Sequence, residues 1–208
     1  MKKRSIALLM AVVMLFGATV GGTIAWLKAE SETVTNTFTF GDVSIVLDES
    51  KLNTDGTLDT ATRVQRNEYK LIPGRIANKD PMVTVGSNSE DCYVFVKITE
   101  KNNTFTGTEA VSALAGKIIN YTVGEDWTKV AEGVYVYGNP TVVKAGAELK
   151  DILSGNTVTV NSDLTKEQSA VINTGEKPTL EFVAYAIQAD SLPATATTPA
   201  AIWALINS

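Results

Sequence analysis

The spacing of hydrophobic residues along this chain changes near residue 30. Residues 6–20 form an almost unbroken apolar run behind a basic start, Met1 to Arg4. Further along, apolar and polar residues alternate with a period of two, which is typical of strands with one buried face. The pattern therefore separates an N-terminal leader from a β-rich remainder.

The clearest predicted strand covers residues 92–99, where apolar side chains alternate with Tyr93 and Phe95 on the opposite face. Because both faces are apolar at its start, we expect this strand to be central in a sheet. A second long strand is predicted over residues 179–188, and a pair of strands over 124–137. We expect the polar stretch 48–62 to form a loop or a long hairpin turn.

Helices are expected only as short pieces. Thr165 and Gln168 have the spacing of a capping box, and Thr198 followed by Pro199 predicts a C-terminal helix. The alanine-rich residues 109–117 are a third candidate helix. Many short strands separated by turn residues then predict an all-β fold: a two-sheet antiparallel sandwich, jelly-roll-like, with short helical insertions and a C-terminal helix.

The leader has the order of an export signal: basic residues, an apolar centre and small residues at a cleavage point. Cleavage is expected after Ala25, with Thr23 as the small residue two positions earlier, and Ala29 gives an alternative. An uncleaved leader would instead act as a membrane anchor, because residues 6–27 are long enough to span a bilayer. We expect residues 26–208 to form a single secreted β-sandwich domain with an N-terminal arm, residues 26–40.

Charge and residue composition argue against several classes of partner and enzyme. The chain has 18 basic and 23 acidic residues, and loss of the three basic leader residues makes the excess of acid larger. This charge argues against nucleic-acid partners and against binding to an anionic membrane, so that only the uncleaved leader would contact a bilayer. The absence of histidine removes the Ser-His-Asp triad and the usual zinc protease motif. We therefore expect no catalytic residues and no enzyme activity.

Calcium is the one cofactor that the sequence suggests. Asn53, Asp55 and Asp59 place oxygen ligands around Gly56, a combination that calcium favours. The spacing of a complete EF-hand is missing, and the same residues are typical of a simple turn.

The single cysteine and the tyrosines are further candidates. Cys92 is either a reactive thiol or a small buried hydrophobic residue, and its place on an apolar strand face favours burial. Tyrosines on predicted strands provide either a sugar-binding platform or ordinary packing. They are Tyr69, Tyr93, Tyr121, Tyr135, Tyr137 and Tyr185.

A family resemblance rests on several segments: Gly21-Gly22-Thr23-Ile24-Ala25-Trp26, the residues Asn36, Phe38 and Gly41, Lys70-Leu-Ile-Pro73-Gly74, and residues 90–97 and 182–190. These segments resemble the TasA/camelysin family of exported proteins from Gram-positive bacteria. It implies cleavage by a signal peptidase of the SipW type. Family members include a jelly-roll subunit of biofilm-matrix fibres and proteins described as casein-cleaving metalloproteases.

The N-terminal arm is the segment from which we predict a function. Residues 30–40 are extended in character and rich in Thr and Val, and such a segment can join a neighbour's sheet through main-chain hydrogen bonds. We expect Thr33, Val34, Phe38 and Phe40 to be the inserted side chains of a biofilm-matrix or surface-fibre subunit or accessory, which self-associates or binds a related matrix protein. The alternatives are an arm that completes its own sheet and a monomeric cell-surface module that binds a glycan or protein. A secreted protease is a weaker third hypothesis.

Overall fold

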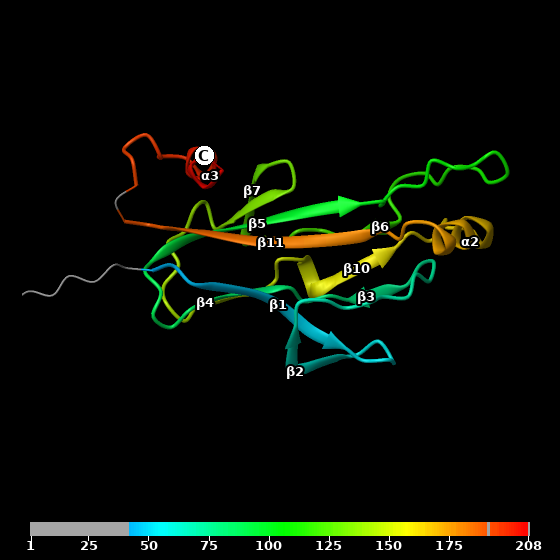
Figure 1. Ribbon diagram of the computed structural model, residues 1–208, viewed down its shortest axis with the longest axis horizontal. Helices are drawn as coiled ribbons and strands as arrows, with labels where there is room; N and C mark the ends of the chain where they lie inside the picture. Colours follow the sequence, from blue (N-terminus) through cyan, green and yellow to red (C-terminus); the bar gives the residue numbers. More distant parts are fainter. Residues whose placement is uncertain (1–41, 191, 208) are drawn as a thin grey trace, which may run out of the picture. The chain divides into compact units, whose positions relative to one another are not determined.

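The computed structural model describes residues 42–190 and 192–207, and these belong to a unit of the chain that runs from Gly41 to Ser208. Short β-strands dominate it, as Figure 1 shows. The strands are β1 (Ile45–Leu52), β2 (Leu58–Val64), β3 (Ile76–Asn78), β4 (Met82–Val85), β5 (Cys92–Lys101), β6 (Ile119–Asn120), β7 (Trp127–Ala131), β8 (Val134–Tyr137), β9 (Glu148–Leu149), β10 (Thr157–Val160) and β11 (Thr179–Gln188). The helices are the 3₁₀ turn η1 (Ser154–Asn156), α2 (Lys166–Thr174) and α3 (Pro199–Ile206).

The strands form antiparallel sheets, which confirms the predicted all-β sandwich with helical insertions and a C-terminal helix. One sheet has the order β2-β1-β4-β9 and another the order β11-β5-β8-β7. A small third sheet, β3-β10-β6, was not predicted from the sequence, because its members pair over only two or three residues each.

The main core lies between the two larger sheets. Val83 and Val85 of β4 and Val94 and Val96 of β5 are completely buried, with side chains that belong to one cluster. The interior position of β5 confirms the central strand predicted for residues 92–99. Full burial of one such aliphatic side chain contributes about 1.5–3 kcal/mol to folding.

The C-terminal helix covers the other face of the β11-β5-β8-β7 sheet. Trp203 of α3 lies 5.5 Å from the Phe95 ring and 5.1 Å from the Tyr185 ring, measured between centroids. The helix begins as predicted, with the Thr198 side chain accepting a hydrogen bond from Ala201 N and with Pro199 in the first turn. Both faces of β5 are therefore buried, which explains the apolar residues on both sides of this strand.

The other capping prediction is also confirmed. Thr165 accepts from Gln168 N at the start of α2, and the Gln168 side chain accepts from Thr165 N. A smaller apolar cluster joins α2, through Ile172, to Ile118 and Val160.

The helix expected over residues 109–117 is wrong. Thr104 forms a β-bridge with Lys117, and Leu114 N donates to Phe105 O, so this segment is an extended loop that folds back on itself. Gly107 and Gly116, with φ of 86° and 79°, flank the alanine-rich stretch and permit the reversals.

The polar stretch 48–62 contains more strand than the sequence indicated. β1 continues to Leu52 and β2 begins at Leu58, so only a tight turn between them is irregular. Two of its polar residues, Glu49 and Ser50, are buried instead of facing water. Their partners come from distant parts of the chain.

Candidate functional site

The sequence-predicted cleavage and assembly residues lie outside the residues that the structure describes. They are Thr23, Ala25, Thr33, Val34, Phe38 and Phe40. The hypotheses on the leader and on the arm therefore remain predictions.

Of the calcium candidates, Asn53 and Asp55 lie in the turn between β1 and β2, and Asp59 is the second residue of β2. Asp55 Oδ1 accepts from Thr57 N at 2.9 Å and from Thr57 Oγ1 at 2.7 Å, and these bonds lower the pKa of Asp55. Asp59 Oδ1 accepts from Ala61 N at 3.1 Å. Across residues 42–190 and 192–207, no three Cys, Asp or Glu side chains converge in a way that could hold a metal ion. The observed contacts are those of a hydrogen-bonded turn.

Cys92 and the tyrosines have packing roles. Cys92 is fully buried, and burial followed by the charge of Asp91 raises the pKa of its thiol. All six tyrosines are partly buried, and Tyr69 and Tyr121 lie outside strands, contrary to expectation. Tyr135 and Tyr137 pack on the main core, whereas Tyr93 and Tyr185 pack on the α3 side.

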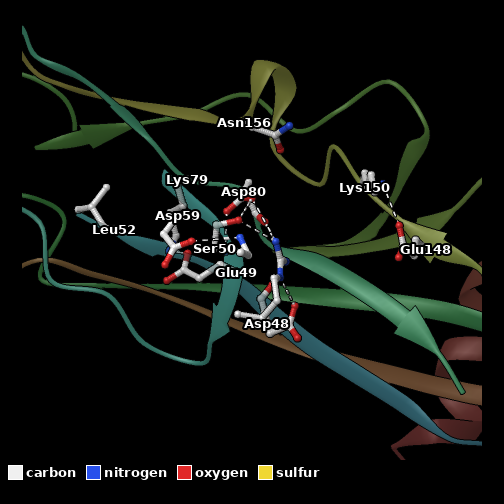
Figure 2. A network of polar contacts seen from close by, with 12 residues as sticks. Asp48, Glu49, Ser50, Leu52, Asp59, Lys79, Asp80, Glu148, Lys150 and Asn156 are labelled. Carbon is white, nitrogen blue, oxygen red and sulfur yellow. Dashed lines mark hydrogen bonds and ion pairs between the residues drawn. The ribbon is translucent and has the colours of Figure 1, made fainter. Parts of the chain in front are cut away.

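A polar network centred on Arg63 joins β1, β2 and the segment before β4. Arg63 Nε lies 2.8 Å from Asp48 Oδ1, and Arg63 NH1 lies 3.2 Å from Asp80 Oδ2. Asp80 also accepts from Ser50 N at 2.9 Å and from Ser50 Oγ at 2.7 Å. Figure 2 shows Asp48, Ser50 and Asp80 gathered in this network. The network satisfies polar groups in strands that the sequence had suggested were loop.

An ion pair of low exposure lies beside this network. Lys79 Nζ is 2.7 Å from Glu49 Oε2, and the two side chains are 10% and 8% exposed. The Tyr69 and Phe182 ring centroids lie 5.2 Å and 5.1 Å from the same nitrogen. Burial and then the Glu49 carboxylate raise the pKa of Tyr69 well above its usual range, so its hydroxyl stays protonated at neutral pH.

A polar depression of about 460 Å³ opens at the Arg63 network, on the β2-β1-β4-β9 sheet. The residues that line it include Ser50, Arg63, Asp80, Lys150 and Asp151. Its charged groups already have partners. Arg63 pairs with Asp80, Lys150 Nζ lies 2.8 Å from Glu148 Oε2, and Asp151 Oδ1 accepts from Asn156 Nδ2. A ligand here would have to compete with these contacts, so the depression favours a weak polar ligand at most.

The outer edge of β11 presents a different kind of site, made of backbone. Among the described residues, the ten residues of β11 pair only with β5. Ile98 N donates to Gly133 O, so the backbone groups of Ile98 point toward the β8 side of β5. Ile98 lies opposite Phe182 in the register, and these two residues therefore form a pair without direct hydrogen bonds between them. The N–H and C=O of Phe182 therefore point away from β5, toward the open edge, and Ala184 follows the same alternation.

The side chains along this edge are incompletely covered. The core-facing residues of β11, of the start of β1 and of the segment just before β1 pack on the main core but remain partly exposed. β1 runs beside β11. By contrast, Val94 and Val96 on β5 are 0% exposed. The partly exposed residues are Val43, Ile45, Leu47, Leu180, Phe182, Ala184 and Ala186. We call them, with the outer edge of β11, the open seam. One more strand along β11 would pair the backbone groups of this edge and cover these side chains.

Sequence reasoning missed both features for different reasons. The alternation over residues 179–188 predicts the strand but not its position at an edge, which depends on the topology. The polar network brings together residues between positions 48 and 80. The one local signal for it is that polar residues continue the alternation of β1 over residues 48–52.

No protein-family model matches this chain, and neither the curated proteins nor the solved structures contain a match. Within the described residues, none of the helices has the length and apolar character needed to cross a membrane.

Proposed function

We propose that this chain is a secreted, non-enzymatic structural protein, a subunit or accessory of an extracellular biofilm-matrix or surface fibre. It assembles when residues 30–40 of the N-terminal arm add as a strand to the open seam of a neighbouring copy. The observation that carries the proposal is the edge of β11, which pairs with no other strand among the described residues, together with the partly exposed core-facing side chains behind it.

The chemistry of the arm fits this seam. Main-chain hydrogen bonds supply affinity in strand addition, and alternate side chains supply specificity. Phe38 and Phe40 are two residues apart, so both would face the core side of an added strand, against apolar residues such as Phe182 and Ala184. Thr33 and Val34 have the high strand propensity that such a segment needs.

An arm on one copy and an acceptor edge on the next fit a fibre better than a closed dimer. An arm that leaves one copy and binds the seam of the next makes a head-to-tail contact, and such contacts produce open filaments when the rotation does not close. An arm that folds onto its own seam would give a monomer instead. The two cases differ in the concentration dependence of assembly.

Deletion of residues 30–40 should abolish assembly, because it removes the donor strand and leaves the described domain complete. We expect filaments or an oligomer ladder from the intact mature protein and a monomer from the deletion, measured by negative-stain microscopy. Thr39→Ser, which changes the same arm without altering Phe38 or Phe40, is the control and should assemble normally. Normal fibres from the deletion would contradict the proposal.

The polar depression supports the second candidate, a monomeric surface module for a glycan or protein. This candidate requires binding at residues such as Arg63 and Lys150 that is retained when residues 30–40 are deleted. Titration of the deleted protein with oligosaccharides distinguishes it from the matrix hypothesis, in which the arm is essential.

A further inference from the structure

The buried Lys79–Glu49 pair has the composition of a covalent cross-link in its unreacted state. We propose that the Lys79 amine condenses with the Glu49 carboxyl group to form an intramolecular amide bond. This inference is independent of the proposed assembly, because it concerns contacts within a single copy. It identifies a modification site for a nucleophile that the matrix function does not use.

The two reacting groups lie close together. Lys79 Nζ is 2.7 Å from Glu49 Oε2, so the amine lies next to the carboxyl carbon that it would attack. The two residues are 8% and 6% exposed, which holds both side chains in place and restricts water. Fixed, desolvated reactants have effective concentrations far above those of free solutes, which favours reactions that are slow between separate molecules.

The surroundings give the reaction a driving force. An ion pair taken out of water incurs a desolvation cost that its mutual attraction often fails to offset. An amide removes both charges, so burial favours the product. The Tyr69 and Phe182 rings stabilise the ammonium form in the resting pair, but they equally form apolar walls around the neutral amide.

The reaction balances without any external reagent. Transfer of one proton along the contact from Lys79 Nζ to the Glu49 carboxylate gives a neutral amine and a neutral acid. The nitrogen lone pair then attacks Cδ, forming the C–N bond, and the C–O bond breaks. The hydroxyl group leaves with a proton from nitrogen as one molecule of water, and no atom is oxidised or reduced.

Tyr69 is placed to assist the loss of water. Its hydroxyl lies 3.4 Å from Glu49 Oε2, the oxygen that takes the proton from Lys79 Nζ and leaves as water. A donor aimed at an oxygen that gains negative charge as its C–O bond breaks stabilises that transition state. The tyrosine therefore supplies the hydrogen-bond donor, whereas lysine and glutamate supply the bond.

The cross-link would have a clear structural consequence. Glu49 lies in β1 and Lys79 lies thirty positions later, between β3 and β4, so the amide would tie β1 to the segment that joins β3 and β4. With one cysteine in the chain, a disulfide within one copy cannot perform this task. Closing a loop by a covalent bond stabilises a fold mainly by restricting the unfolded chain.

The test is the intact mass of the full folded protein under denaturing conditions, with its first residue identified from the N-terminal peptide. We expect a mass lower by one water molecule, about 18 Da. Tryptic digestion should then yield a branched peptide in which the segment ending at Lys51 is joined to a segment containing an uncleaved Lys79. Lys79→Arg keeps the positive charge but not the amine, and it should show the full mass, no branched peptide and a lower thermal midpoint.

A full mass for folded wild-type protein, with separate peptides for Glu49 and Lys79, would overturn the proposal. So would a loss of water that maps to another site, such as cyclisation of an N-terminal glutamate or dehydration of an aspartate. Circular dichroism on the same sample establishes that the protein measured is folded.

Discussion

Replacing Ala184 with proline should stop assembly and leave the domain folded. Ala184 lies opposite Val96 in the register of β11 and β5, at a pair whose backbone groups point away from β5. Proline therefore removes a donor from the open seam without removing a hydrogen bond of the sheet, a position at which edge strands tolerate it. Loss of one donor alone lowers an association constant by about tenfold, and the ring also blocks the approach of a strand.

The matched control is Ala184→Val, which adds a side chain of similar size to proline at the same inward position but keeps the N–H. We expect filaments from the valine variant and monomers from the proline variant, with circular dichroism showing a β-sheet spectrum for both. Filaments of normal length from a folded proline variant would exclude the edge of β11 as the acceptor. Assembly would then have to use another surface.

Replacing Asp80 with alanine should cause a clear loss of stability, about 1–3 kcal/mol. The Asp80 carboxylate accepts hydrogen bonds from Ser50 N and Ser50 Oγ and pairs with Arg63, so the variant leaves three donors without their acceptor. Ser50 is 0% exposed, so water cannot replace the lost oxygen without rearrangement. Urea unfolding followed by tryptophan fluorescence measures the difference.

Glu148→Ala is the comparison for this experiment. Its carboxylate pairs with Lys150 at 2.8 Å, but the two side chains are 52% and 61% exposed, and exposed pairs contribute between about 0 and 1 kcal/mol. A similar unfolding midpoint for the two variants would show that the Arg63 network does not hold the β1–β2 hairpin in place.

The fold was predictable where local pattern and tertiary context agree. Residues 179–188 alternate cleanly and form β11 with the expected bounds, and Thr165 and Thr198 start helices because their side chains cap the first turn. Residues 109–117 failed because helix propensity is weak beside tertiary contacts, here the bridge from Thr104 to Lys117.

The candidate site was less accessible to sequence reasoning. The open seam depends on which strand is left at the edge of a sheet, and the pairing of β11 with β5 joins segments about eighty residues apart. The Lys79–Glu49 pair is similarly non-local, and in the sequence each residue is one charge among many. Alternation specifies which side chains face inward, but the identity of their neighbours is a property of the whole fold.

We expect the mature protein to polymerise through its arm. The most direct measurement is size-exclusion chromatography with negative-stain microscopy, over a range of concentrations, on protein that starts at Trp26. We predict filaments or an oligomer ladder that grows with concentration and that is lost when residues 26–40 are removed. A monomer at every concentration would contradict the account and would direct attention to ligands of the polar depression.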